Sequence, residues 1–309
     1  MGRFILKVFL LAFIAFIFPL FVILLKIAPQ YTHVYNASFI DKMARLERIK
    51  EPKIVLVSNS NLAFGIQSDL IEDALGMPVV NLGLNAALGN AFHERMPLFN
   101  LTKGDVIVIA HFDYNDNDTI PDPELALLTV ENYFHYWKIF RPKDYPRLIR
   151  VLPTYARKCL FRFLRKADRE PATPNCYARS AFNEYGDNIF PRNIEADESK
   201  LSLGHMSVND TCMNRINALS RYCKKKGVAV VIAGAPIVSG LEGFNLDEYK
   251  RFHAEVESRA ECPVISDFTD YVFDKAYFYD TALHMTNDGA KLRTEQLIKD
   301  LKVFLAEAE

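Results

Sequence analysis

Short runs of β-branched residues alternate along most of the chain with segments in which apolar residues recur at helical spacing. The runs predict buried strands, at residues 53–57, 79–81, 106–110, 228–233 and 263–266. The helical spacing predicts helices that begin at Ser68 or Asp69, at 86–101, after Asn209, at 246–260 and after Gly289. Strands that alternate with helices are typical of an α/β protein whose parallel sheet is covered on both faces.

An uncharged apolar run extends from Val8 to Leu25, eighteen residues in all. As a helix this run would be ~27 Å long, close to the ~30 Å hydrocarbon core of a bilayer. Arg3 and Lys7 precede it, which favours a cytoplasmic N-terminus. We therefore expect residues 1–28 to be a single-pass anchor in the inner (cell) membrane, with the rest of the chain periplasmic or extracellular. A cleaved signal peptide is the alternative.

Residues 29–52 are predicted to link this anchor to an α/β domain at 53–309. The alternating pattern breaks between 119 and 205, which predicts an insertion. Its segment from Lys138 to Lys166 carries ten Lys and Arg residues against one acid, Asp144, with aromatic residues between them. Two interpretations stay open: a solvated helical lid with a basic face, or a surface that meets anionic lipid headgroups or an anionic glycan.

The overall charge narrows the possible partners. Lys and Arg number 37 and Asp and Glu 38, a formal net charge of −1. A chain with this balance is not expected to bind nucleic acid. Its scattered cysteines predict neither a zinc site nor a disulfide framework, and no cofactor is expected. Residues 113–124 place oxygen-bearing side chains at four calcium-loop positions, but Asp118 stands where that loop needs glycine. The sequence therefore favours a polar loop without metal.

Polar side chains follow the predicted strands at the edge where a parallel sheet binds its ligands. Ser60 follows the first strand, and Asp280 and His284 precede the last helix. In this order they match a hydrolase with Ser60 as nucleophile, His284 as general base and Asp280 holding the imidazole. Gly83 and Asn85, after the second strand, are the candidate oxyanion and substrate-binding residues.

These segments resemble the SGNH (GDSL-like) hydrolase superfamily. The resemblance is greatest to its membrane-anchored branch, which includes the alginate O-acetylation and D-alanyl-lipoteichoic acid biosynthesis proteins. It covers about 53–118 and 228–309, through Ser60-Asn61, Phe64-Gly65, Asn81-Leu82-Gly83, Asp280, His284, Gly289 and Arg293-Thr294. It implies a three-layer, flavodoxin-like parallel sheet. It also implies a serine esterase or O-acyltransferase that acts on a cell-surface glycan or polymer.

Three features depart from the superfamily pattern. Ser58 stands two residues before the nucleophile, where glycine is expected, and is itself an alternative nucleophile. His111-Phe112-Asp113-Tyr114 replaces the third block, Gly-x-Asn-Asp. The spacing from Asp280 to His284 is four residues rather than three. The altered third block and Ser58 favour an alternative function: a catalytically inactive scaffold that binds a glycan or a membrane-bound acyltransferase.

Overall fold

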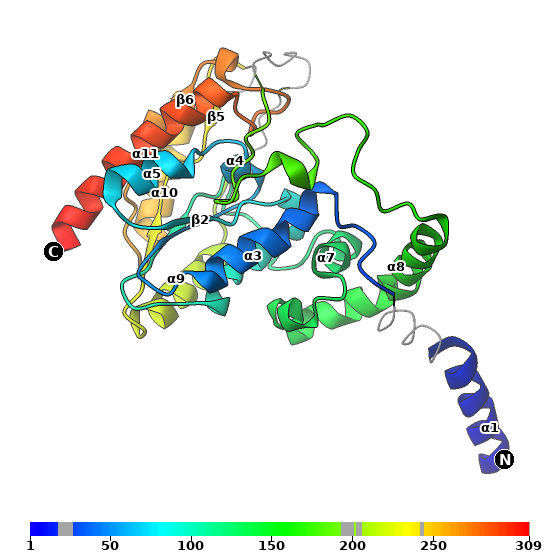
Figure 1. Cartoon of the computed structure of the whole chain (residues 1–309). Helices are drawn as coiled ribbons and strands as arrows, with labels where there is room; N and C mark the ends of the chain where they lie inside the picture. The colour runs from blue at the N-terminus through cyan, green and yellow to red at the C-terminus, as the bar shows by residue number, and fades with distance from the viewer. Residues whose placement is uncertain (18–26, 193–200, 202–205, 242–243, 309) are drawn as a thin grey trace.

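The computed structural model describes residues 1–17, 27–192, 201, 206–241 and 244–308 (Figure 1). At its centre is a parallel sheet with the strand order β2–β1–β3–β4. Its members are β1 (Ile54–Val57), β2 (Val79–Asn81), β3 (Val106–Ile109) and β4 (Ala229–Ile232). Four predicted strands are thus present. The fifth, at 263–266, is reduced to a single parallel bridge between Val264 and Ile232.

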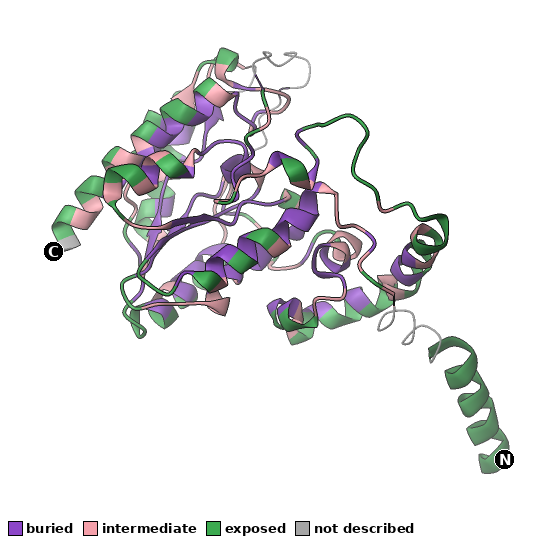
Figure 2. Cartoon of the chain, viewed as in Figure 1, coloured by how far each residue is buried: buried purple, intermediate pink, exposed green. Residues whose placement is uncertain are grey.

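Helices cover both faces of this sheet, as the alternating pattern predicts. One face packs on α5 (Ser68–Leu75) and α11 (Asn287–Ala308), around Ile54 and Leu56 of β1. The other packs on α3 (Ser38–Arg48), α9 (Asp210–Lys224) and α10 (Leu246–Arg259), around Val55 and Val57. Figure 2 shows the strands buried and the outer sides of these helices exposed. Strands buried on both faces explain the nearly continuous apolar runs in the sequence.

The helix predicted at 86–101 is wrong, because the segment consists of three short pieces. They are η3 (Ala86–Leu88), α6 (Asn90–His93) and η4 (Met96–Phe99). Gly89 separates the first two with φ of +82°, a conformation that glycine adopts far more readily than other residues. Pro97, at the start of η4, has no N–H to continue a helix.

Residues 29–52 differ from the predicted linker, because most of them pack against the domain. The 3₁₀ turn η2 (Tyr35–Ala37) leads directly into α3. Phe39, Met43 and Leu46 of α3 are fully buried in the core beside the sheet. The apolar spacing of these three residues is helical, so the signal is present in the sequence.

The described part of the insertion is mostly helical. It contains α7 (Pro123–Val130), η5 (Phe134–Ile139), η6 (Pro142–Asp144), α8 (Tyr145–Arg165) and η7 (Arg179–Ala181). Helix α8 packs on α7 and runs through Pro153. Residues 193–200 and 202–205 of the predicted insertion lie outside the described residues.

The first residues form α1 (Gly2–Ala12) and a π-helical segment, η1 (Phe13–Ile17), and all of them are exposed (Figure 2). The rest of the apolar run, from residue 18 onward, lies outside the described residues. Within the described part of the chain, none of the helices combines the length and the apolar character that crossing a bilayer requires. The anchor therefore stays a prediction.

Candidate active site

Two segments that are far apart in the sequence, one with Ser60 and one with Asp280 and His284, meet at the carboxyl edge of the sheet. Ser60 is the first residue of α4 (Ser60–Ala63), three positions after β1 ends. Its Oγ lies 2.8 Å from Nε2 of His284, whose Nδ1 lies 2.8 Å from Oδ1 of Asp280. Because the carboxylate only accepts, Nδ1 is the imidazole donor and Nε2 is left to accept from the Ser60 hydroxyl. The structure thus brings together the predicted nucleophile, base and acid.

The order of the strands explains why the nucleophile lies here. The chain passes from β1 to β2 on one side and then returns to β3 on the other side of β1. In a parallel sheet, the crevice at such a reversal is the usual ligand site. Ser60 follows β1 and therefore lies beside this crevice.

A turn accommodates the four-residue spacing between Asp280 and His284. The Thr281 hydroxyl accepts from the backbone N–H of His284 at 3.2 Å, and the N–H of Tyr279 donates to the His284 carbonyl at 2.8 Å. This closed turn directs the Asp280 carboxylate and the imidazole toward each other. The departure from the superfamily spacing therefore leaves their contact intact.

Two aromatic side chains hold the imidazole and the carboxylate. Phe64 stacks on the His284 ring, with centroids 4.1 Å apart and planes 10° apart. The Tyr177 hydroxyl donates to the Asp280 carboxylate. Burial raises the pKa of Asp280, but hydrogen bonds from His284 and Tyr177 outweigh that effect and hold it below its ordinary value. Asp280 is therefore ionised and able to stabilise an imidazolium.

The turn that carries Ser60 is braced from several sides. Asn61 is fully buried, and its side-chain amide donates to the Ala110 carbonyl, beyond β3, at 3.1 Å. The buried Arg293 donates to the Asn61 carbonyl at 2.7 Å. A Cβ on Gly65 would lie 2.4 Å from that same carbonyl oxygen, so only glycine fits. These residues of the resemblance thus support the nucleophile turn.

The expectation for Gly83 as an oxyanion donor is wrong. Its N–H donates to Oδ1 of Asn81 at 2.9 Å and is not available to a substrate. A Cβ at Gly83 would lie 2.6 Å from the backbone nitrogen of Ala63, so Gly83 instead lets this loop approach the nucleophile turn closely. Asn85 stays a candidate for this role: its Oδ1 accepts from Ala87, and within the described residues nothing accepts from its Nδ2. Within the described residues nothing accepts from the backbone N–H of Ser60 either.

Ser60 and His284 open into a cleft of about 490 Å³. Apolar side chains, among them Leu125 and Leu128 of α7, form much of its wall, and Asn85 lies on its lining. A mostly apolar cleft with a few polar groups is the usual form of a small-molecule site. The site therefore has both a reactive end and a binding volume.

Sequence reasoning missed two residues that the insertion contributes. Tyr177 contacts Asp280, as described above. Arg192, fully buried, donates to the Phe64 carbonyl and to the Met285 carbonyl, each at 3.1 Å. It thereby joins the nucleophile turn to the loop that carries His284. Neither residue lies in a recognisable motif. The one signal in the sequence is that the insertion lies between two segments that carry sheet-edge loops.

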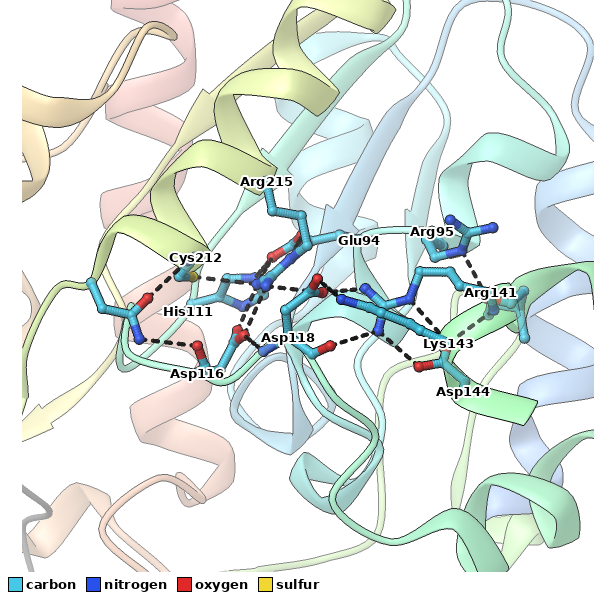
Figure 3. A network of polar contacts seen from close by, with 12 residues as sticks. Glu94, Arg95, His111, Asp116, Asp118, Arg141, Lys143, Asp144, Cys212 and Arg215 are labelled. Carbon is cyan, nitrogen blue, oxygen red and sulfur yellow. Dashed lines mark hydrogen bonds and ion pairs between the residues drawn. The ribbon is translucent and has the colours of Figure 1, made fainter. Parts of the chain in front are cut away.

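A second serine–histidine–carboxylate chain lies behind the first. Ser58 Oγ is 3.2 Å from Nδ1 of His111. Nε2 of His111 is 3.1 Å from Glu94 (Figure 3). Glu94 in turn pairs with Arg215 at 2.5 Å. Ser58, His111 and Glu94 are all buried. Ser58 therefore has the partners of a nucleophile without access to a substrate.

The same network extends to the insertion. Arg215 pairs with Asp116 at 2.6 Å, and Asp118 accepts from Arg141 and Lys143 of the insertion (Figure 3). Two acids of the segment 113–124, Asp116 and Asp118, are thus engaged by cationic side chains. Among the described residues no group of His, Cys, Asp or Glu side chains is arranged to hold a metal ion. All five cysteines are buried and free of disulfide bonds.

No family model matches the chain, and no curated protein matches it. Among solved structures it is similar to a GDSL-like lipase from Bacteroides thetaiotaomicron, with 10% identity and a TM-score of 0.41. The match covers 86% of this chain and 97% of that one. The case for activity rests on the geometry of Ser60, His284 and Asp280.

Proposed function

We propose that this protein is a serine esterase or O-acyltransferase that forms an acyl-enzyme on Ser60. The observation that carries the proposal is the unbroken chain of hydrogen bonds from Ser60 through His284 to Asp280, both at 2.8 Å. This is the arrangement in which a weak hydroxyl nucleophile is activated by an adjacent base that a third group orients.

The geometry supports a two-step reaction. Ser60 Oγ attacks the acyl carbonyl while its proton passes to Nε2 of His284, and ionised Asp280 stabilises the resulting imidazolium. The N–H of Ser60 and the side-chain amide of Asn85 are the donors available for the oxyanion. When the tetrahedral intermediate collapses, His284 returns the proton to the departing alcohol oxygen. Water or a second hydroxyl group then releases the acyl group by the same steps in reverse.

We further propose that the acceptor is a cell-surface glycan or polymer and that residues 1–28 anchor the enzyme in the membrane. The support comes from the apolar run from Val8 to Leu25 and from the resemblance of the motifs. The inactive-scaffold hypothesis draws on the altered third block. That block holds His111, whose contact with Ser58 braces the nucleophile turn and leaves the Ser60 chain complete.

The test is acyl transfer from p-nitrophenyl acetate by the full chain in detergent, with and without an oligosaccharide acceptor. We expect an initial burst of p-nitrophenolate, because acylation of Ser60 precedes release of the acyl group. Acetylated oligosaccharide identifies a transferase, and acetate alone an esterase. Folded protein that gives no burst and no turnover beyond its Ser60→Ala variant contradicts the proposal.

A further inference from the structure

The active-site cleft adjoins a second hollow on the surface of α8. This hollow, which we call the cationic groove, has a volume of about 370 Å³. Its lining is Tyr31, Phe161 and four cationic residues: Arg157, Lys158, Arg162 and Arg165. Tyr31 and Arg162 also line the cleft that holds Ser60 and His284. The two cavities therefore adjoin at this pair.

Helical spacing places the four cations together. Lys158 and Arg162 are four residues apart on α8 and form one row along the helix. Arg157, Phe161 and Arg165 have the same spacing and form the neighbouring row on the same side. Arg162 is fixed at the junction: its Nε donates to the Gln30 carbonyl at 2.8 Å, and its guanidinium lies 4.3 Å from the Tyr31 ring centroid. A guanidinium held in this way loses little freedom when it meets an anion.

The acids nearby leave the groove with an excess of positive charge. Glu124 pairs with Lys158. Asp168 lies 3.9 Å from Arg162 and already accepts two hydrogen bonds from Thr32. Within the part of the chain that the structure describes, Arg157 and Arg165 have no ion pair.

A third acid, Glu131, lies beneath the groove and adds little negative charge. Its carboxylate accepts from the backbone N–H groups of Gln30 and Tyr31. Burial raises its pKa to about 7, so near neutral pH it is protonated in much of the population. The groove therefore keeps cations that are free to bind an anionic group.

The groups that line the two cavities indicate the chemistry of a ligand. The nucleophile lies in one, the apolar side chains Val34, Leu125 and Leu128 share that cavity, and the cations line the other. We infer that the substrate is an acyl ester that also carries an anionic group, a carboxylate, phosphate or sulfate, bound in the cationic groove. That the substrate is an ester rests on the proposed function. That the groove binds an anionic group does not. The basic segment predicted at 138–166 would then act in substrate choice.

The kinetic test compares esters that differ in charge. One pair carries the charge on the acyl side, p-nitrophenyl succinate against p-nitrophenyl butyrate. The other carries it on the alcohol side, 4-acetoxyphenylacetate against 4-methylphenyl acetate. The measured quantity is the ratio of kcat/KM for the anionic ester to that for the neutral one. We expect the double variant Arg157→Glu/Arg165→Glu to lower this ratio at least ~10-fold for one pair, through lost attraction and added repulsion.

The matched control is Arg150→Glu, a reversal at an exposed position on the same helix that does not line the groove. It should leave the ratio unchanged. An unchanged ratio in the double variant, with the fold intact by circular dichroism, overturns the inference. So does a double variant that only loses adsorption to phosphatidylglycerol vesicles, because that result assigns the cations to a membrane surface.

A binding arm separates this inference from the proposed function. In the Ser60→Ala background, octyl phosphate should bind more tightly than octyl glucoside, and the double variant should remove that preference. If wild-type protein hydrolyses no ester while this preference holds, the proposed function fails and the anionic site stands. Equal binding of the two probes removes the anionic site whatever the enzyme hydrolyses.

Discussion

Two serine–histidine–carboxylate chains lie at the same edge of one sheet, and they face opposite environments. In the first, Ser60 meets Nε2 of His284 and Asp280 meets Nδ1. In the second the ring is reversed: Ser58 meets Nδ1 of His111, and Glu94 meets Nε2. Both chains thus run from serine through histidine to a carboxylate, and the orientation of the ring and the surroundings distinguish them.

The two chains differ in whether a substrate can reach the serine and in which group pairs with the carboxylate. Ser60 lines a cleft of about 490 Å³, whereas Ser58 is fully buried and also accepts from the side chain of Asn61 at 3.0 Å. Asp280 is half-buried beside an aromatic hydroxyl, while Glu94 is buried against the guanidinium of Arg215. Glu94 is held in a buried ion pair with a permanent cation. Among the described residues Asp280 pairs with no Lys or Arg, so its charge is available to stabilise the imidazolium.

The largest expected effect separates the two serines. Ser60→Ala and His284→Ala should each remove at least ~10³-fold of ester turnover, because the members of such a chain act as a unit. The readout is kcat for p-nitrophenyl acetate. Ser58→Ala is the matched control and should retain activity within ~10-fold, since Ser58 only braces the turn. Activity lost in Ser58→Ala and kept in Ser60→Ala would exchange the roles of the two chains.

Asp280→Asn should lower kcat by ~10²- to 10⁴-fold. The amide can hold the imidazole in the wrong tautomer and cannot stabilise the imidazolium. KM should change little, because Asp280 does not line the cleft. A variant with full kcat would show that His284 works without an oriented carboxylate and would remove Asp280 from the mechanism.

For the buried chain the expected effect is on stability. Glu94→Gln removes the buried carboxylate that Arg215 and His111 share, while Arg215 keeps its pair with Asp116. Breaking a buried ion pair destabilises by ~3 kcal/mol. Urea unfolding measures this loss. The control is Arg221→Gln, which breaks an exposed pair with Glu261 and should change the free energy of unfolding by less than ~1 kcal/mol. Equal losses in the two variants would mean that the buried chain is not a brace.

The smallest effect concerns the hydroxyl group of Tyr177 on Asp280. Hydrogen bonds from His284 and Tyr177 lower the pKa of that carboxyl below its ordinary value. Tyr177→Phe removes one of them, so the Asp280 pKa rises and the carboxylate is lost at a higher pH on acidification. We expect kcat at neutral pH to fall only ~2- to 5-fold and the acid limb of the pH profile to move toward higher pH. An acid limb that moves the other way contradicts this assignment.

Sequence pattern predicts most of the scaffold and the catalytic chain, for identifiable reasons. Buried parallel strands are apolar on both faces, and this pattern is visible at 54–57 and 106–109. Ser60, Asp280 and His284 are recognisable because each lies at a strand or helix boundary in a hydrolase order. The helix at 38–48 is also visible in the sequence, because its apolar residues recur at helical spacing. The anchor predicted before this segment favours its interpretation as a linker.

Side-chain hydrogen bonding is the level that the sequence does not predict. The sequence does not show that the Asn81 side chain accepts the hydrogen bond from the Gly83 N–H. Tyr177 and Arg192 reach the site from an insertion with no recognisable pattern, so only tertiary contacts reveal them. His111 appears as a departure from a motif. Its contact with Ser58 becomes evident only when β1 and β3 lie side by side.

The most direct test is labelling of the folded protein with a fluorophosphonate, followed by mass spectrometry of the peptide that contains both serines. The probe reacts only with a serine that is both activated and accessible. The account predicts the label on Ser60 alone, no label on Ser58, and loss of labelling in His284→Ala but not in a folded His111→Ala variant. A label on Ser58, or no label on a folded wild-type chain, would contradict it.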